Sequence, residues 1–202
     1  MKTNCPNGNL TEARIRKLLL SSEDLPRLEF LPYMGLRPAS VLIPIFCSER
    51  EWHLLLTRRT ESVNDHKGQV SFPGGASEAG DASPEITALR EAQEEIGINP
   101  GDVTVLGKLP AQPTISKFLV TPVVGRIPWP YEFKLSSEEV ERVFSIPLSW
   151  LAMPGHFEER PYMLPDGNLH PVIFFKIYDG EVLWGISARM TVILLKTLKL
   201  VN

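Results

Sequence analysis

The alternation of apolar and polar positions between Ser83 and Gly97 predicts an amphipathic helix. Ser83 is a suitable N-cap, Pro84 suits the first turn, and Gly97 ends the apolar periodicity. We therefore expect a helix over about 84–96. At about 100° per residue, one arc of this helix is apolar and is expected to be buried. That arc comprises Ile86, Leu89, Ala92 and Ile96. The opposite arc carries three carboxylates: Glu91, Glu94 and Glu95.

Apolar runs of strand length lie on both sides of this helix. They predict strands over 40–46, 52–58, 103–109, 118–127 and 182–184, and a hairpin over 159–163 and 170–178 turned at Asp166 and Gly167. Further helices are predicted over 12–20, 147–153 and 188–200, the last of them capped by Ser187. Strands, one helix, more strands and a final helix indicate an α/β fold, with a mixed β-sheet sandwiched between α-helices.

Length and composition fit one core and exclude several classes of protein. The 202 residues are 43% hydrophobic, and we divide them into an N-terminal segment, 1–36, with one helix and a single domain over 37–202. A net charge of −3 argues against a nucleic acid as the main partner. We expect a monomer or homodimer.

Location and redox state are predicted from two further features. No apolar run approaches the length that spans a bilayer, and the polar start lacks the apolar core of a signal peptide, so we expect no membrane partner. Cys5 and Cys47 fit neither a disulfide framework nor a zinc site. The sequence therefore favours a reducing compartment, and we predict a cytoplasmic protein.

The three carboxylates on the helix between 84 and 96 are candidate ligands of a divalent cation. At spacings of three and four residues like charges repel each other, and a hard cation such as Mg²⁺ or Mn²⁺ would relieve that repulsion. Arg90 lies one turn before Glu94 and is placed to orient its carboxylate. Upstream, the turn formed by Phe72, Pro73, Gly74 and Gly75 permits close backbone approach to a metal or a phosphate. The plain alternative is that the acidic arc is a solvated helix face.

These residues resemble the Nudix box, the motif of hydrolases that act on nucleoside-diphosphate-linked compounds. The second half of the motif, Arg-Glu-aliphatic-any-Glu-Glu-any-Gly-aliphatic, is matched by Arg90, Glu91, Ala92, Glu94, Glu95, Gly97 and Ile98. In the first half, Gly75 and Asp81 match the glycine and the early acidic position only if the loop is one residue longer than the general pattern. The resemblance implies a metal-dependent hydrolase with an α/β/α fold, while the role of Asp81 stays open.

A longer run, from Leu55 to Gly75, resembles the signature of coenzyme A diphosphatases within that family. Nine positions of the signature agree: Leu55, Leu56, Thr57, Arg59, Gly68, Phe72, Pro73, Gly74 and Gly75. Thr60 replaces a serine and keeps the hydroxyl, whereas Asn64 replaces an arginine and removes a charge. The resemblance implies cleavage of coenzyme A to adenosine 3',5'-bisphosphate and 4'-phosphopantetheine.

The resemblance also assigns roles to residues. Glu91, Glu94, Glu95 and the backbone of Gly75 are implied metal ligands, and Arg90, Glu94 and Glu139 are implied catalytic residues. Glu139 comes from a later loop, where Glu138 and Glu141 are alternatives and a solvated charge run is the plain explanation. Arg58, Arg59, His66 and Lys67 are the candidates for phosphate contacts of the substrate, because arginine forms bidentate bonds to phosphate and lysine supplies a point charge. Surface solvation is again the alternative.

Two other functions stay open. Asn64 leaves room for another nucleoside diphosphate derivative as substrate, such as a dinucleotide, a nucleoside diphosphate sugar or an RNA cap. A Nudix fold can also serve as a ligand-sensing module without catalysis. The complete set of Arg90, Glu91, Glu94 and Glu95 argues against the sensing module, because such a module has no need of three mutually repelling acids.

Overall fold

The computed structural model describes residues 5, 10–21, 35–61, 68–163, 167 and 169–202, and the side chains of all of these except 20 and 21. Its helices are α1 (Glu12–Ser21), α2 (Pro84–Ile96), α3 (Leu148–Leu151) and α4 (Gly185–Thr197), with a 3₁₀ turn, η3 (Pro100–Asp102). Its strands are β1 (Arg37–Ser48), β2 (Glu51–Arg59), β3 (Val70–Ser71), β4 (Gly74–Ala76), β5 (Thr104–Lys108), β6 (Gln112–Pro113), β7 (Phe118–Arg126), β8 (Val140–Pro147), β9 (Phe157–Met163) and β10 (Leu169–Phe175). None of the described helices is long and apolar enough to cross a membrane.

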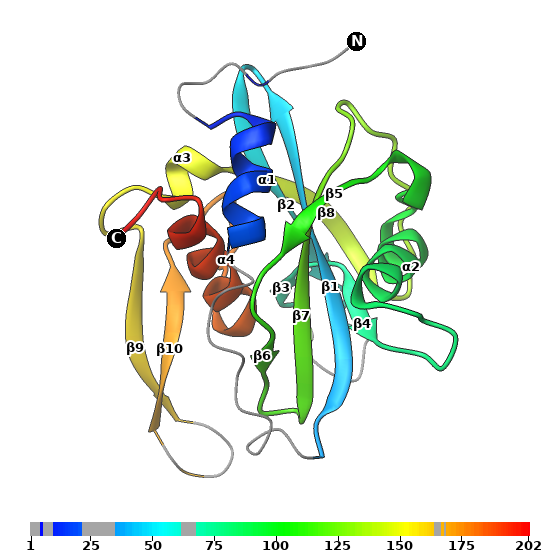
Figure 1. Ribbon diagram of the computed structural model, residues 1–202. Helices are drawn as coiled ribbons and strands as arrows, with labels where there is room; N and C mark the ends of the chain where they lie inside the picture. Colours follow the sequence, from blue (N-terminus) through cyan, green and yellow to red (C-terminus); the bar gives the residue numbers. More distant parts are fainter. Residues whose placement is uncertain (1–4, 6–9, 22–34, 62–67, 164–166, 168) are drawn as a thin grey trace.

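The centre of the molecule is an eight-stranded mixed sheet built around β1 (Figure 1). Strand β1 pairs in parallel with β7 and antiparallel with β2 and β4. Strand β8 extends the sheet beyond β2, while β5 and β6 both pair with β7. Strand β1 is apolar from Val41 to Cys47 and buried on both faces from Leu42 to Phe46, which is the pattern expected of a strand covered by two layers.

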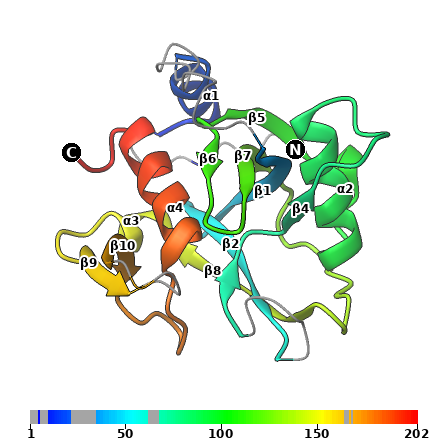
Figure 2. The same cartoon turned by 90° about the horizontal axis from the view of Figure 1, so that it is seen from below.

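Helices cover both faces of the sheet (Figure 2). On one face α2 packs through Ala88, Ala92 and Ile96 against apolar side chains of β1, β2 and β7. On the other face α1 and α4 pack into a larger core, to which they contribute Ile15, Leu19, Met190, Leu194 and Leu195. The predicted α/β fold, a mixed sheet between helices, is therefore confirmed.

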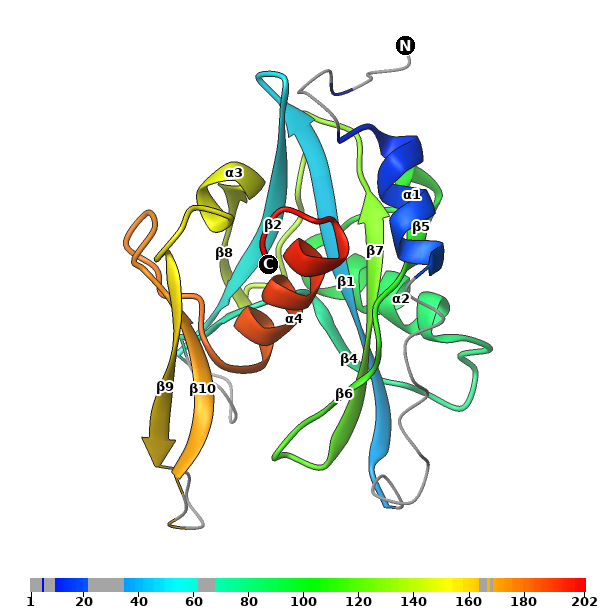
Figure 3. The ribbon, with the colours of Figure 1, turned by 60° about the vertical axis from the view of Figure 1, so that its left-hand side comes forward.

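The hairpin of β9 and β10 forms a separate two-stranded sheet beside α4 (Figure 3). Its predicted existence is confirmed, although the predicted turn residue Asp166 lies outside the described residues. The prediction of a strand over 182–184 is wrong. That segment makes only an isolated bridge between Trp184 and Phe174 and a hydrogen bond of 2.8 Å from the Phe175 N–H to the Leu183 carbonyl, since helix α4 begins directly after it at Gly185.

Helix α4 begins and ends earlier than the sequence predicts. It follows directly on the bridge at Trp184, so Ser187 lies inside the helix, buried, and is not its cap. The carbonyl of Ser187 accepts a hydrogen bond of 2.9 Å from the Thr191 hydroxyl. At the other end Lys199 has a φ of +58°, a left-handed conformation that ends the helical path before residue 200.

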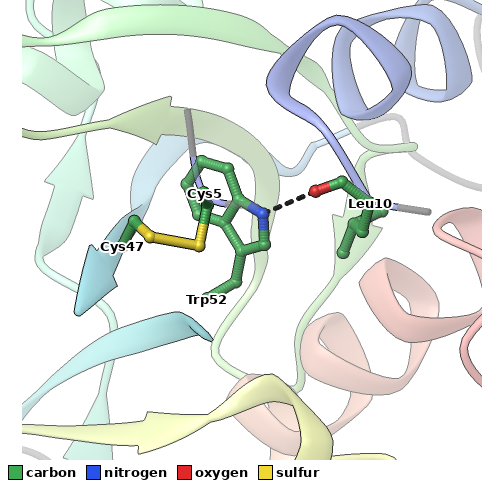
Figure 4. Close-up of a disulfide and its surroundings, with 4 residues drawn as sticks. All are labelled: Cys5, Leu10, Cys47 and Trp52. Carbon is green, nitrogen blue, oxygen red and sulfur yellow. Dashed lines mark hydrogen bonds between the residues drawn. A yellow bond between two sulfur atoms is a disulfide. The ribbon is translucent and has the colours of Figure 1, made fainter. Parts of the chain in front are cut away.

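The N-terminal segment is attached to the body by several contacts. Helix α1, predicted over 12–20, buries Ile15 and Leu19 in the main core, and Glu12 forms an ion pair of 2.9 Å with Arg126. Cys5 and Cys47 form a disulfide, with Cα atoms 5.5 Å apart, beside Trp52 (Figure 4). The indole Nε1–H of Trp52 donates to the carbonyl of Leu10 at 2.7 Å. The expectation that the two cysteines form no disulfide is therefore wrong, because spacing in sequence does not reveal that the end of β1 meets the N-terminal segment. The division at residue 36 stays a prediction.

The disulfide generates a prediction about stability. Because it joins positions 42 residues apart, it restricts the unfolded chain, and Cys47→Ser is expected to lower the free energy of unfolding by about 2–4 kcal/mol. Urea unfolding without reductant would measure this difference. With a thiol reductant present, wild type and variant should unfold at the same urea concentration, and a wild type indifferent to reductant would contradict the prediction.

Candidate active site

Helix α2 has the bounds and caps that the sequence predicts. The Ser83 hydroxyl accepts from the Ile86 N–H at 3.4 Å, and Gly97 is left-handed with a φ of +72°. Its buried arc, however, is rotated from the expected one. Ile86 is 45% exposed, whereas Thr87 and Ala88 are buried. The reason is the loop before the helix: the Thr87 hydroxyl hydrogen-bonds to Ser77 and Asp81 of that loop, which keeps the Thr87 side chain buried.

Glu95 does not fit the alternative of a solvated acidic arc, since it is only 2% exposed. The loop before β8 covers it: the N–H groups of Lys134 and Ser136 donate to the last carbonyls of the helix at 3.1 and 2.8 Å. Burial raises the pKa of Glu95 to about 8 against the lowering effect of Arg59, while the charges of Glu139 and Glu91 add to the rise. Among the described residues, Glu95 Oε2 has no hydrogen-bond partner.

Arg90 joins the helix carboxylates to the preceding loop. Its Nη1 contacts Glu91 Oε1 at 3.0 Å and Glu94 Oε2 at 3.1 Å, so the predicted contact with Glu94 is present. Its Nη2 donates to the carbonyl of Ala76 at 3.0 Å. One guanidinium therefore fixes two candidate metal ligands relative to the glycine turn.

Asp81, whose role the sequence left open, holds Arg90 from the other side. Its two carboxylate oxygens accept from Arg90 Nε at 3.3 Å and Nη2 at 3.0 Å. Its side chain is 5% exposed, and it also accepts from the Glu78 N–H and the Thr87 hydroxyl. The hydrogen bonds from Arg90 and Glu78 lower the pKa of Asp81 to about 2. Asp81 is thus an anchor for the arginine, and the longer loop in the motif was the only sequence signal of it.

The glycine turn brings backbone directly against Glu91. Strand β4 pairs Gly74 with Val41 and Gly75 with Ser40 of β1. A Cβ on Gly75 would lie 2.6 Å from the Glu91 carboxylate, and one on Gly74 would lie 2.4 Å from the Ser40 carbonyl oxygen. Only glycine leaves the space that Glu91 occupies. Burial raises the pKa of Glu91 against the lowering effect of Arg90, and the neighbouring charges of Glu94 and Glu139 raise it further.

These carboxylates fit a hard divalent cation. The charge of Glu139 raises the pKa of both Glu91 and Glu95, and Glu95 presents a buried oxygen to which no described residue donates. Within the described part of the chain no three acidic, histidine or cysteine side chains form a ready-made metal site. Arg59 contacts Glu95 Oε1 and Arg90 contacts Glu94 Oε2, so in this structure two arginines offset part of the negative charge. Carboxylate oxygens are the ligands that Mg²⁺ and Mn²⁺ prefer.

Glu139 is the loop glutamate that reaches this cluster. Its carboxylate is 3.8 Å from Arg59 Nη2, and Arg59 Nη1 is 3.4 Å from Glu95 Oε1. Of the alternatives, Glu141 forms an ion pair with Arg58 at 3.1 Å, and the carbonyl of Glu138 accepts from the Thr60 hydroxyl at 2.8 Å. The catalytic role of Glu139 stays a prediction.

The predicted phosphate contacts separate into three groups. Arg59 faces the carboxylates of α2, whereas Arg58 forms ion pairs with Glu61, Glu141 and Glu181. His66 and Lys67 lie outside the described residues. Contact of any of the four with a substrate stays a prediction.

Comparisons with known proteins agree with this arrangement. A family model described as the NUDIX domain matches residues 36–166. A protein of Citrobacter koseri named uncharacterized Nudix hydrolase NudL is 42% identical over 152 residues, covering 75% of this chain and 78% of the relative. Its namesake from Pectobacterium atrosepticum is 40% identical over 155 residues, covering 76% and 79%. Among solved structures, a MutT/nudix family protein from Enterococcus faecalis is similar in fold, with a TM-score of 0.52 and 14% identity over 95% of this chain and 76% of that one.

The contact between Gly75 and Glu91 generates the first prediction about the site. Gly75→Ala places a methyl group where the Glu91 carboxylate lies, and we expect Mn²⁺ affinity to fall about tenfold, or about 1.4 kcal/mol. Isothermal titration of metal-free protein would measure it. Gly80→Ala, in the same loop but with open space around the added methyl, is the matched control and should bind Mn²⁺ like wild type. Equal affinities for both variants would contradict the prediction.

The buried Glu95 generates a prediction about pH. An unfolded glutamate loses its proton near 4.5, whereas burial raises the pKa of folded Glu95 to about 8. Between these values the folded state binds more protons, so the stability of metal-free protein should fall as pH rises. Glu95→Gln should remove this contribution. Thermal unfolding in a chelator at about pH 5.5 and about pH 8 checks it, and identical pH dependence in both proteins would show that Glu95 is not responsible.

Proposed function

The chain belongs to the Nudix family of hydrolases, which act on nucleoside diphosphate derivatives, and on that premise we propose that it cleaves the diphosphate of coenzyme A or its derivatives. The products would be adenosine 3',5'-bisphosphate and 4'-phosphopantetheine, or acyl-phosphopantetheine from an acylated substrate. The observation that carries hydrolysis is the carboxylate cluster itself. Glu91 lies against Gly75, and Arg90 bridges Glu91 to Glu94.

Each residue of the cluster has a role in the proposed reaction. Glu91, Glu94, Glu95 and the Gly75 carbonyl would hold Mg²⁺ or Mn²⁺. When bound, such an ion neutralises charge on the phosphoryl oxygens and acidifies the attacking water. Arg90 fixes the direction of Glu91 and Glu94, and Asp81 fixes Arg90. Glu139 would accept the proton of the water at its carboxylate, with a helix glutamate as the alternative acceptor.

The substrate class rests on the signature between Leu55 and Gly75. Arg58, Arg59, His66 and Lys67 are its candidates for contacts with coenzyme A phosphates. Because Asn64 replaces an arginine of the signature, another nucleoside diphosphate derivative is the second candidate substrate. A sensing module without catalysis is less well supported, because such a module has no need of three mutually repelling acids. We propose a monomer or homodimer, and the disulfide between Cys5 and Cys47 removes the argument from reduced cysteines for a cytoplasmic location.

Mass spectrometry after incubation with coenzyme A and Mg²⁺ or Mn²⁺ tests the proposal. We expect both halves of coenzyme A to appear and a chelator to stop them. Glu95→Gln should reduce the rate by about 10²-fold or more, since it removes a candidate metal ligand. If coenzyme A survives while another diphosphate in a panel is cut, the substrate assignment fails. If every diphosphate survives, the sensing module is favoured. If cleavage occurs and Glu95→Gln leaves its rate unchanged, Glu95 is not a required metal ligand.

Dephospho-coenzyme A tests the phosphate contacts separately. If the basic residues after β2 bind the 3'-phosphate, the protein should use dephospho-coenzyme A much less well than coenzyme A, because a charge-assisted contact is lost. The comparison of kcat/KM for the two compounds measures the difference. Equal values would remove the 3'-phosphate from recognition without affecting the proposed reaction.

A further inference from the structure

The end of β2 lies beside the two segments that supply acidic side chains: helix α2, which carries Glu95, and the loop before β8, which carries Glu139. Strand β2 pairs with β8, and its register shifts between Arg58 and Arg59, so that Arg59 lies opposite Val140. This irregularity places the residue after the strand, Thr60, beside the loop that carries Glu139. The same strand end is held to the loop before the glycine turn, where the Arg59 N–H donates to the Gln69 carbonyl at 3.0 Å.

Thr60 fixes the backbone of the Glu139 loop. Its N–H donates to the Glu139 carbonyl at 3.0 Å, and its hydroxyl donates to the Glu138 carbonyl at 2.8 Å. The loop is also held to helix α2, since the Ser136 N–H donates to the Glu95 carbonyl at 2.8 Å. Hydrogen bonds to Thr60 and to the Glu95 carbonyl therefore fix the backbone of this loop, independently of any contact of the Glu139 side chain.

Arg59 fixes the carboxylates. One guanidinium nitrogen lies 3.4 Å from the buried Glu95 and the other lies 3.8 Å from Glu139, which is 46% exposed on its side chain. Two acidic groups from distant parts of the sequence are therefore bridged by one planar cation. The fork geometry of arginine suits this bridge, whereas a single lysine ammonium presents one point charge.

The neighbouring arginine shows that this placement is specific. Arg58 makes its ion pairs with Glu61, Glu141 and Glu181, and none of these is a member of the carboxylate cluster. Among the described residues, two arginines contact the cluster. Arg90 serves Glu91 and Glu94, and Arg59 serves Glu95 and Glu139.

We propose that Arg59 is a positioning residue: an internal counter-ion that holds Glu139 beside Glu95 and is the cation that a divalent metal displaces. This assignment rests on the proposed hydrolytic function of the cluster, and it differs from a direct contact between Arg59 and a substrate phosphate. In the signature that carries the resemblance to coenzyme A diphosphatases, Arg59 and Thr60 then serve the catalytic loop, not the ligand.

The first experiment uses metal binding without substrate. Arg59→Gln removes a positive charge that competes for Glu95 and Glu139, so Mn²⁺ should bind about threefold to tenfold more tightly in an isothermal titration. Arg59→Lys keeps the charge and should bind Mn²⁺ as wild type does, within about twofold. Weaker Mn²⁺ binding by Arg59→Gln would mean that the residue only maintains the fold of the site, and unchanged binding would mean that it does not compete for the carboxylates. Either result overturns the proposal.

The second experiment separates kcat from KM on whichever diphosphate the wild type hydrolyses. Arg59→Gln should lower kcat about tenfold or more with KM within about twofold, and Arg59→Lys should recover part of kcat. A raised KM with unchanged kcat would instead identify a substrate contact. Arg142→Gln is the matched control, because Arg142 is an arginine on β8 whose ion pairs are with Asp179 and Glu181, away from the cluster. It should leave both constants unchanged.

A double-variant comparison identifies the group through which Arg59 acts. If it acts through Glu139, Arg59→Gln should have little further effect on kcat once Glu139→Gln is present, since coupled residues are not additive. Full additivity would overturn the assignment. The Mn²⁺ titration needs no substrate, so a failure of coenzyme A cleavage leaves it decisive, and the two proposals fail independently.

Discussion

The structure depends on an unfavourable arrangement: several carboxylates gathered in a small, partly buried volume. Glu95 is enclosed under the loop before β8, and Glu91 is pressed against the backbone of Gly75. Burial and mutual repulsion both disfavour the charged forms, which is why the pKa values of these two groups rise. The surrounding elements compensate for this arrangement, and a bound divalent cation would complete the compensation.

Two arginines offset the negative charge of these carboxylates, and each arginine is held by a different part of the fold. Arg90 is held by Asp81 in the loop before α2 and by the Ala76 carbonyl at the end of β4. Arg59 is held at the end of β2, where the strand register shifts against β8. Strand β1 lies at the centre of the sheet and pairs with β2, β4 and β7. It therefore sets the distance between Arg59, at the end of β2, and Arg90, which is held at the end of β4. The sheet therefore places the two arginines next to the carboxylates with which they pair.

The two helical layers have different tasks. Helix α2 carries the candidate chemistry and is packed on one face through small and aliphatic side chains, which allow it to lie close to the sheet. Helices α1 and α4 cover the other face with a larger apolar core, and the disulfide and Trp52 fix the segment before α1 to the same side. That second layer packs on the face of β1 and β2 opposite to α2, against Ile43, Ile45, Leu54 and Leu56.

The bounds and caps of α2, six of the ten described strands and the acidic residues of the site could be predicted from the sequence, because these depend on local periodicity, capping and motif spacing. Strands β3, β4, β6 and β8, which pair with β2, β1, β7 and β2, were not predicted. Tertiary structure decided which of those acids is buried. Glu95 lies on the polar arc of the helix but is buried in the fold, where the Ser136 N–H of the loop before β8 donates to its carbonyl and Arg59 contacts its carboxylate. The contacts of Asp81 and Arg59, the pairing of Cys5 with Cys47, and the early start of α4 likewise depend on segments far apart in sequence. No local pattern encodes such meetings, since they are set by how the layers pack.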